Sequence, residues 1–512
     1  MAPRGSRKWW ALGGVVLAVL AVSLDLTVLS VALPTLAGAL KASESDLQWF
    51  SSGYALVLAA AMLPAGLLGD RYGRKKVMLV SLGFFAVGSA ACARSTSPGE
   101  FIAARALLGL AGAGIVVMAI SALAVLFSEE ERPKAIAIWA AANMVGFPIG
   151  PILGGWLLSH YWWGWVFLMN VPVAVIGFSA AAVLVPESKA ESSPGFDGLG
   201  VVLSSGGLAG LTYGFIEAGQ HGWSSVSALA PMATGVVVLF GFFLWQRTLW
   251  SRPNGQPLVD VSLFQSGAFT WGVVLFTVLT MALVGLLFTM PQYFQAVMGT
   301  NAEGSGIRLL PVVAGLLVGL VPAQTISKLV GAKAAVTAGF VILAGGLALG
   351  TQTSVGSGEA FDALCLAIAG VGTGLTMATV ASGALAELSE ERAGVGSAVL
   401  QALKNTGAPL GSAVLGSTLM AGYTGHLRLP GLPARAVAEA RVGVFQGAAV
   451  ARAARSGAAL TAVRAAFVHG MSSALAVSVV FALVGAATAL FFLPSVKAKG
   501  HEEAEANERI AA

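Results

Sequence analysis

The chain has 512 residues, of which 56% are hydrophobic and only 10% are charged, and its mean hydropathy is +0.82. An average soluble domain carries about 25% charged residues, so an ordinary soluble enzyme is excluded. The net charge is +5, and the basic residues lie mostly at the ends of apolar stretches, which favours lipid headgroups rather than nucleic acid as partners. The composition predicts an all-α integral membrane protein.

About fourteen stretches are long enough to cross a membrane, because a helical span needs roughly 20 mostly apolar residues. In chain order they are 9–36, 49–69, 77–93, 100–126, 134–157, 163–185, 198–219, 227–249, 268–290, 306–326, 334–353, 360–385, 395–422 and 465–494. The first follows Arg7 and Lys8 and is too long for a signal peptide, so we expect it to be retained.

The Lys and Arg residues predict the topology. They concentrate in the N-terminal tail and in every second loop after it, whereas the short loops between these hold only Lys41, Arg94 and Arg308. Basic loops stay in the cytoplasm, so we expect a multi-pass membrane protein with both termini there. The segment 423–464 is expected outside yet is rich in arginine, and its Ala and Arg spacing indicates an amphipathic helix or hairpin.

The sequence repeats itself at a spacing of about 260 residues. Residues 112–132 are similar to residues 372–392, and the pattern from Gly146 to Gly150 returns from Gly407 to Gly411. Duplicated halves with a binding site between them are typical of transporters. The expected parts are an N-terminal tail (1–8), a six-helix bundle (9–185), a two-helix insert with flanking loops (186–267), a second six-helix bundle that includes 423–464 (268–494) and a C-terminal tail (495–512).

In the first span, Asp25 is expected within the hydrocarbon. A carboxyl group there costs about 2.5–3.5 kcal/mol on insertion scales, and desolvation makes it a candidate proton carrier. The alternative is a carboxyl capped by a local hydroxyl such as that of Thr27. Arg105 in the fourth span either extends outwards to water or faces inwards and biases the protonation of Asp25. Its counterpart in the repeat is Cys365, so the proton machinery is expected in the first half alone.

The link between the second and third spans combines glycines with charged residues. A tight hairpin needs the backbone freedom of glycine, and Asp70 can face a helix N-terminus or pair with an arginine. We interpret the link as a charge latch that holds one conformer; anchoring by basic residues would explain the Arg and Lys but not Asp70. The latch residues are Gly66, Asp70, Arg71, Gly73, Arg74 and Lys75.

The fifth span carries a stripe of small residues. Gly146, Gly150 and Gly154 recur every four residues, which lets helices approach closely. The alternative to a functional role is a packing seam. Pro151 and Gly155 belong to the same string.

In the second half, Lys404 lies on one helical face with Gln401, Ala408 and Gly411. A polar stripe in a membrane helix should face protein or a water-filled cavity. Lys404 therefore pairs with Asp25, binds an acceptor on the substrate, or extends to the cytoplasm. The repeat positions give further cavity-lining candidates, and three more are expected at the outer mouth of the ninth span. The two groups are Tyr54, Asn143, Met144, Gln401, Lys404 and Asn405, and Gln292, Tyr293 and Gln295.

The sequence lacks several motifs that are typical of enzymes. The sequence has no HExxH, no GxxxxGK[ST] and no Ser/His/Asp arrangement, so we expect no enzyme, no metal and no cofactor other than protons. The acids Glu217 and Asp362 near span ends are expected to be solvated. A membrane-embedded enzyme would need a catalytic constellation, and none is visible in the sequence. A purely structural or sensor protein would not need Asp25 and the duplicated halves.

These strings together resemble the major facilitator superfamily, and most closely its fourteen-span drug:proton antiporter family of the QacA/EmrB type. The likeness covers nearly the whole chain: Gly66–Lys76 is similar to the family's cytoplasmic-loop motif, Gly146–Gly155 to its antiporter motif, and Leu24–Pro34 and Arg105–Gly114 to its first-span and fourth-span motifs. The resemblance implies two bundles that rock around a central cavity.

The resemblance also implies a function. It implies export of amphiphilic drugs or antibiotics in exchange for protons, with Asp25 as the coupling acid and Arg105 as its helper, by a protein that we expect to be a monomer. A proton-coupled importer or a uniporter would share the fold, but the complete antiporter motif argues against it. No acid is found deep in the second half, and Lys404 stands there instead. We therefore expect neutral, zwitterionic or anionic amphiphiles to fit better than dications.

Overall fold

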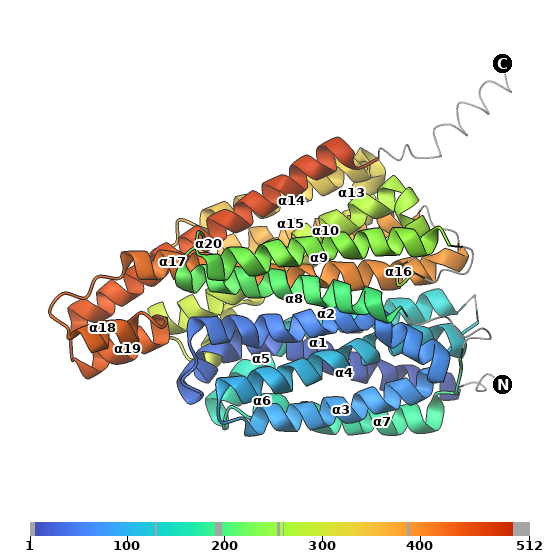
Figure 1. The fold of residues 1–512 in the computed structure, drawn as a ribbon, viewed down its shortest axis with the longest axis horizontal. Coiled ribbons are helices and arrows are strands. Elements are labelled where there is room, and N and C mark those ends of the chain that lie inside the picture. Colours follow the sequence, from blue (N-terminus) through green and yellow to red (C-terminus); the bar gives the residue numbers. More distant parts are fainter. Residues whose placement is uncertain are drawn as a thin grey trace, which may run out of the picture.

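The computed structural model describes residues 6–128, 131–189, 197–252, 257–259, 261–386 and 390–494. In these residues the chain forms helices that run roughly along the long axis of the molecule (Figure 1). The two ends of the chain, marked N and C, lie towards the same end of the molecule (Figure 1), which we call the terminal face. The loop 40–43 and the short helices near residues 434–453 lie at the opposite end, which we call the hairpin face.

The first group of helices, here the N-terminal bundle, is built from the apolar runs before residue 185. Its members are α1 (Ser6–Ala39), α2 (Glu44–Tyr72), α3 (Arg74–Arg94), α4 (Pro98–Leu126), α5 (Arg132–His160), α6 (Trp165–Leu168) and α7 (Asn170–Leu184). Helix α1 packs on α5 and α7, α2 packs on α4, and α3 packs on α4 and α7. Polar side chains cap helix starts: Ser43 caps α2 and exchanges hydrogen bonds with Asp46, and Ser97 caps α4.

The second group, here the C-terminal bundle, repeats this packing. Its members are η1 (Val261–Gln265), α10 (Gly267–Gln292), η2 (Tyr293–Val297), α11 (Ala302–Arg308), α12 (Leu310–Leu320), α13 (Ala323–Val330), α14 (Ala332–Gly350), α15 (Glu359–Ala386), α16 (Glu390–Asn405), α17 (Gly407–His426), α18 (Ala434–Ala440), α19 (Val444–Ala453) and α20 (Gly457–Phe492). Here α10 packs on α17 and α20, α12 packs on α15, and α14 packs on α15 and α20. Each of these pairs is the counterpart of one in the N-terminal bundle.

Some expected spans are interrupted in the structure. The stretch 306–326 is divided among α11, α12 and α13, because Pro311 and Pro322 lie where α12 and α13 begin. The stretch 395–422 is divided into α16 and α17 next to Thr406, three residues before Pro409. The glycines between α2 and α3 and between α13 and α14 occupy the same place in the repeat. Gly73 has φ +111° and Gly331 has φ +86°, a conformation that glycine adopts without strain.

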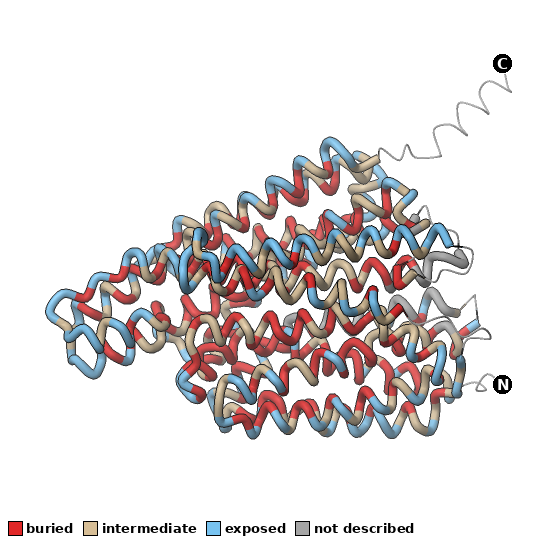
Figure 2. Tube along the Cα trace, in the orientation of Figure 1, coloured by how far each residue is buried: buried red, intermediate tan, exposed pale blue. Residues whose placement is uncertain are grey.

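The two helices of the insert, α8 (Gly198–His221) and α9 (Val226–Trp250), form a tight pair. Helix α8 packs on both α2 and α17 and so touches both bundles. Helix α9 packs mainly on α8 and is largely exposed, and its tube is mostly pale blue and tan (Figure 2). Asp197 joins the start of α8 to the last turns of α9. Its carboxylate accepts hydrogen bonds from Gly200 N, Trp245 Nε1 and Gln246 Nε2 at 2.8, 2.9 and 2.6 Å.

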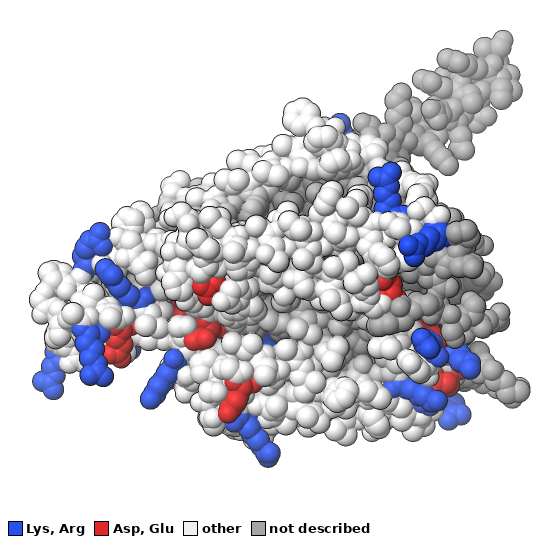
Figure 3. All heavy atoms as spheres, viewed as in Figure 1, with Lys and Arg blue, Asp and Glu red and all other residues white. Residues whose placement is uncertain are grey.

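The length and apolar character of the helices fit a membrane. Twelve helical stretches among the described residues are long and apolar enough to cross one, so the fourteen expected spans are matched only in part. Figure 3 shows Lys and Arg side chains gathered near the two ends, with a mostly uncharged belt between them. The structure is thus an all-helical multi-pass membrane protein.

Candidate functional site

A buried ion pair joins α1 to α4. Arg105 Nη1 donates to Asp25 Oδ2 at 2.5 Å, and the two side chains are 1% and 0% exposed. Ion pairs enclosed in this way are held by strong attraction but carry a large desolvation cost. Arg105 therefore faces inwards and does not extend to water.

Two other helices complete this site. Asn170 at the start of α7 donates from Nδ2 to Asp25 Oδ1 at 3.2 Å, and Arg105 Nε donates to the Phe50 carbonyl of α2 at 3.1 Å. The Arg105 guanidinium lies 4.1 Å from the centre of the Tyr54 ring, a cation–π contact. Asp25, Arg105, Asn170, Phe50 and Tyr54, here the charge site, thus bring together α1, α2, α4 and α7.

These contacts exclude two partners that the sequence left open for Asp25. Thr27 donates its hydroxyl to the carbonyls of Ser23 and Leu24, at 3.1 and 3.3 Å, rather than to Asp25. Lys404 lies 5.0 Å from the centre of the Phe276 ring, and the ion pair of Asp25 is made with Arg105.

Small residues of α4 bring α2 close enough to form the charge site. A Cβ atom on Gly109 would lie 2.5 Å from the Tyr54 carbonyl oxygen, and one on Gly112 would lie 3.1 Å from the Tyr54 hydroxyl. That hydroxyl is buried and has no partner among the described residues. Tyr54, expected to line a cavity, is thus enclosed beside Arg105.

Asn170 was missed by sequence reasoning. Its signal is modest: it is an uncharged polar residue in the apolar stretch 163–185, three residues after Phe167 and two before Pro172. Polar residues inside membrane helices usually face other protein groups. Asn170 follows this rule, because its side chain donates a hydrogen bond to Asp25.

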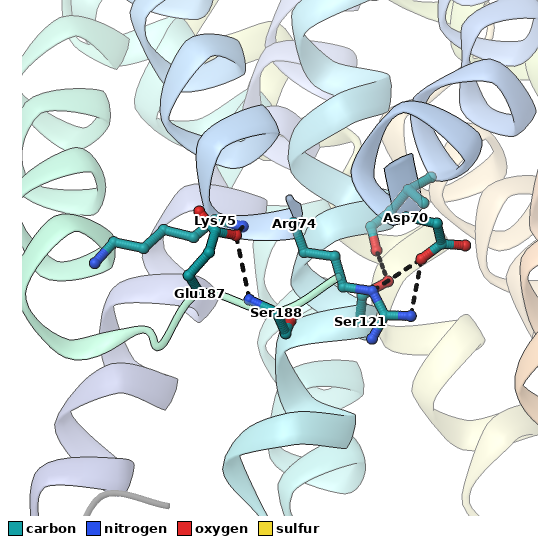
Figure 4. A network of polar contacts seen from close by, with 7 residues as sticks. Asp70, Arg74, Lys75, Ser121, Glu187 and Ser188 are labelled. Atoms are coloured by element: carbon teal, nitrogen blue, oxygen red, sulfur yellow. Dashed lines mark hydrogen bonds and ion pairs between the residues drawn. The ribbon is translucent and has the colours of Figure 1, made fainter. Parts of the chain in front are cut away.

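The latch residues form a network at the terminal face (Figure 4). Arg74 donates from Nε and Nη2 to Asp70 Oδ1 at 3.0 and 2.8 Å. The segment after α7 closes on the same loop: Glu187 accepts from Lys75 N at 3.1 Å, and Ser188 accepts at its carbonyl from Arg74 N at 2.8 Å.

Three further latch residues complete this picture. Gly73 lies where a Cβ atom would approach Glu187 Oε1 to 2.6 Å, and Gly66 faces Val117 of α4. Arg71 lies over the Tyr72 ring at 5.6 Å. Every partner named for these residues belongs to α2–α7 or to the segment directly after α7, so the described contacts tie this bundle to itself.

The glycine stripe of α5 is a seam against α1. A Cβ atom on Gly150 would collide with Thr27 Oγ1, and one on Gly146 would lie 2.8 Å from Leu20 Cδ1. Gly154 faces Val28. Further along, a Cβ atom on Gly155 would lie 2.6 Å from the Ala302 carbonyl of α11, and a Cβ atom on Gly306 of α11 would collide with the Pro151 carbonyl. The string therefore packs α5 within its bundle and also against the other bundle.

The remaining cavity candidates are placed differently from one another. The side chains of Asn143 and Met144 lie outside the described part of the chain. Gln401 and Asn405 lie on α16, partly exposed, and Asn405 Nδ2 is 3.2 Å from Met62 Sδ of α2. Lys404 beside them is also partly exposed, with no ion pair among the described residues.

Gln292, Tyr293 and Gln295 lie towards the hairpin face. Gln292 Nε2 donates to Glu44 Oε1 of α2 at 3.2 Å, and Gln295 Nε2 donates to the Val31 carbonyl of α1 at 3.1 Å. The Tyr293 hydroxyl donates to the Ser354 carbonyl at 2.9 Å. Gln292 and Gln295 join the two bundles, whereas Tyr293 stays within its own.

One expectation about acids is wrong. Asp362 was expected in water, but it is 2% exposed on α15, and its Oδ2 atom has no partner among the described residues. Glu44, which the sequence did not single out, is also 2% exposed. Both acids lie near helix starts, where neighbouring helices and loops cover them.

Comparisons with known proteins agree with this architecture. Residues 15–412 match the family model of the Major Facilitator Superfamily. The chain is 32% identical to a tetracenomycin C resistance and export protein of Streptomyces glaucescens, covering 95% of this chain and 91% of that protein. It is 31% identical to the multidrug efflux pump LfrA of Mycolicibacterium smegmatis (94% and 95%) and 32% identical to the methyl viologen resistance protein SmvA of Salmonella typhimurium (92% and 95%).

A solved structure shows the same fold. It is a bacterial homologue of the human lysosomal transporter Spinster in an inward-facing and unoccupied conformation, with a TM-score of 0.67, 18% sequence identity and coverage of 96% of this chain and 98% of that chain. The family model spans most of the sequence, and relatives above 30% identity cover nearly all of it. The chain therefore belongs to the Major Facilitator Superfamily and is a membrane transporter, not an enzyme.

Proposed function

We propose that this transporter exports amphiphilic drugs or antibiotics, from the cytoplasm or the inner leaflet, in exchange for protons. The printed names of two relatives, which concern antibiotic export and multidrug efflux, support the class of substrate. The charge site supports the proton coupling and is the observation that carries the proposal. It encloses an acid that has no role in the packing of apolar helices.

The coupling follows from the contacts of the charge site. When Asp25 gains a proton it loses its charge, and the attraction to Arg105 weakens. Arg105 keeps its hydrogen bond to the Phe50 carbonyl and its contact with the Tyr54 ring, both on α2. Protonation therefore loosens α1 from α2 and α4. Because α1 and α2 also contact the C-terminal bundle, this change biases how the two bundles are arranged.

The transport cycle uses this bias by alternating access. Facing outwards, Asp25 takes a proton and the drug leaves; facing inwards, the proton leaves and a new drug enters. Proton and drug compete for one conformer, so the binding of each opposes the other. One charge moved across 100 mV is worth about 2.3 kcal/mol, enough for roughly fifty-fold accumulation before any pH gradient is counted.

The membrane arrangement is part of the proposal. Helix α5 and the pair α16–α17 cross the membrane as well, which raises the twelve candidate spans to the fourteen of the QacA/EmrB type. The terminal face is cytoplasmic and the hairpin face is extracellular, as the distribution of Lys and Arg in the loops indicates. The bundles are the two moving parts, α8–α9 is an insert between them, and the protein acts as a monomer in a bacterial plasma membrane.

The proposed substrate preference follows from Lys404, a partly exposed cation on α16. Lys404 has no carboxylate partner among the described residues and lies against the Phe276 ring. A cation beside an aromatic ring suits a flat amphiphile with an acidic or neutral polar group and repels dications. We propose that Lys404 contributes to the drug site.

The first experiment is a proton-flux assay. Inverted vesicles with an acidic lumen and a pH-quenched dye receive cationic, neutral and anionic amphiphiles, with wild type and Asp25→Asn side by side. We expect substrate-dependent alkalinisation of the lumen in wild type and its loss in Asp25→Asn, because the amide cannot carry a proton. An undiminished response in Asp25→Asn would contradict Asp25 as the coupling acid.

The second experiment tests the role of Lys404 in the same vesicles. Lys404→Met keeps the length of the side chain but removes the charge. We expect the export of anionic amphiphiles to fall several-fold while the export of neutral ones changes little, since a lost charge contact removes about 1–2 kcal/mol of binding. Strong export of dications by wild type would contradict the proposed preference.

A further inference from the structure

Several polar contacts join the two bundles towards the hairpin face. Ser52 of α2 and Ser412 of α17 share a hydrogen bond at 2.5 Å, and Gln295 binds the Val31 carbonyl. The loop before α19 reaches back to the N-terminal bundle, where Gln446 Nε2 donates to the Ala42 carbonyl. These contacts must break if the hairpin face is to open.

Glu44 lies at the centre of this seam. Its backbone N–H donates to the Val442 carbonyl at 3.2 Å, and its Oε1 atom accepts from Gln292 Nε2, also at 3.2 Å. Glu44 belongs to α2, Gln292 to α10, and Val442 to the loop between α18 and α19. Glu44 therefore connects the two bundles through its carboxyl group and the covering loop through its backbone N–H.

No cation compensates this carboxyl group among the described residues. On its own helix, Asp46 is engaged with Ser43. Of the groups on facing elements, the Tyr423 hydroxyl of α17 donates to the carbonyls of Ala440 and Gly443, and Arg464 of α20 donates to the Ala296 carbonyl. Lys41 and Arg441 are exposed, and no ion pair with Glu44 is formed in the described part of the chain. A charge buried without a partner is costly, so burial favours the neutral acid.

The hydrogen bonds of Gln292 are a second indication that Glu44 is protonated in this structure. Its Nε2 atom donates to both Glu44 and the Phe288 carbonyl, but its Oε1 atom is buried without a donor among the described residues. A carboxylate has no hydrogen to give, whereas a protonated carboxyl group has one O–H donor. An acid facing an amide can exchange two hydrogen bonds with it, and the unpartnered Oε1 of Gln292 is the acceptor such an acid needs.

We propose that Glu44 is a second proton-binding site, separate from Asp25, which holds its proton while the hairpin face is closed and releases it when that face opens. The proposal rests on the alternating access proposed above. The closed arrangement buries Glu44 as a neutral acid, and opening exposes it to water, where it ionises. The closed state then binds one more proton than the open state, so acid favours closure by up to about tenfold per pH unit.

The test measures the opening of the hairpin face as a function of pH. The full chain, freed of Cys92 and Cys365 by alanine substitution, carries spin labels at Arg94→Cys and Val355→Cys, two exposed positions on opposite bundles at this face. Distances are measured in lipid nanodiscs by pulsed electron resonance between pH 5.5 and 8.5. All variants carry Asp25→Asn, which removes the titration of the charge site.

Three variants in this background decide the outcome. We expect Asp25→Asn alone to shift from short to long distances as the pH rises. Adding Glu44→Gln should make the distribution independent of pH, whereas adding Glu100→Gln, an exposed acid of the same bundle, should leave the shift intact. A shift that survives Glu44→Gln, or no shift in Asp25→Asn alone, would overturn the proposal.

A second variant and a separate measurement complete the test. Gln292→Met removes the amide partner and should lower the closed fraction at pH 5.5 several-fold while Glu44 still titrates; an unchanged closed fraction would also count against the proposal. The proton-flux assay is independent of these distances. Its failure with a preserved pH-dependent distance would reject antiport but leave Glu44 as a proton-binding site of the seam.

Discussion

The N-terminal and C-terminal bundles share their helix packing but differ in what they enclose. Pro34 of α1 and Pro291 of α10 occupy similar places in the two bundles. Nine residues before the first is Asp25, and nine residues before the second is Ala282. At the Arg105 position of the repeat the C-terminal bundle has Cys365. Ala282 and Cys365 are buried, as Asp25 and Arg105 are.

This difference teaches that the fold itself does not need the charge pair. Two small apolar residues fill the same positions in the other bundle, and the equivalent helices still pack. The pair in the N-terminal bundle is therefore maintained at a cost in desolvation, which is expected where a charge does functional work in a membrane.

The largest expected effect in the comparison of the two bundles comes from removing one charge of the buried pair. Arg105→Ala leaves Asp25 buried without its cation, and we expect the free energy of unfolding to fall by about 3–5 kcal/mol. Cys365→Ala at the matching position should cost about 1 kcal/mol or less, because it changes little volume and no charge. Unfolding in detergent, followed by tryptophan fluorescence, measures both.

The control removes both charges together. Asp25→Asn with Arg105→Gln should recover most of the stability lost in Arg105→Ala, since no buried charge is then left unpaired. The proton-flux assay should still show no coupling in this variant. If the double variant were as unstable as Arg105→Ala, the pair would be needed for folding and the comparison between bundles would fail.

A smaller effect concerns the seams that both bundles share. Gly150→Ala collides with Thr27 on α1, and Gly411→Ala would place its Cβ atom 2.9 Å from Met281 Cα on α10. We expect each to lower the free energy of unfolding by about 1–3 kcal/mol, because overfilled contacts force helices apart. Gly13→Ala is the control, since nothing lies within 4 Å of its Cβ position. If Gly150→Ala lowers the free energy of unfolding and Gly411→Ala does not, the close glycine contact is needed in the N-terminal bundle alone.

The smallest effect is expected at the loops between the second and third helices of each bundle. Asp70→Asn removes a partly exposed ion pair with Arg74, and pairs of this kind contribute about 0.3–0.5 kcal/mol. Lys333→Ala at the matching start of α14 should change stability even less, because Lys333 forms no ion pair among the described residues. The same unfolding assay compares them, and a loss above 1 kcal/mol for Asp70→Asn would show a stronger latch than its exposure indicates.

Parts of the fold and of the charge site could be predicted from the sequence, because the apolar interior of a membrane restricts which residues can lie in it. Apolar length predicts helices that fit a bilayer, and an acid or an arginine inside such a run needs a partner, which is why Asp25 and Arg105 stood out. The repeat related the helices of one bundle to those of the other. Pro311 and Pro322 show what length alone misses, since they break the expected stretch 306–326 into shorter helices.

Contacts between segments that are distant in the sequence could not be predicted in this way. Asn170 binds Asp25 only because α7 lies against α1, and nothing in the local pattern around Asn170 indicates that contact. Asp362 lies near a helix start, where water was the expected surrounding, yet other elements bury it. Glu44 escaped notice for the same reason, since a chain segment some 400 residues away covers it.

Helix α20 has a consequence for how the molecule meets its surroundings. Its 36 residues extend about 54 Å at 1.5 Å per residue, whereas a hydrocarbon core is about 30 Å thick. The excess, together with α18 and α19, projects at one end of the molecule (Figure 1). A short epitope inserted at Gly431, in the exposed turn before α18, would make that projection a handle for antibody fragments, useful for orienting particles in electron microscopy.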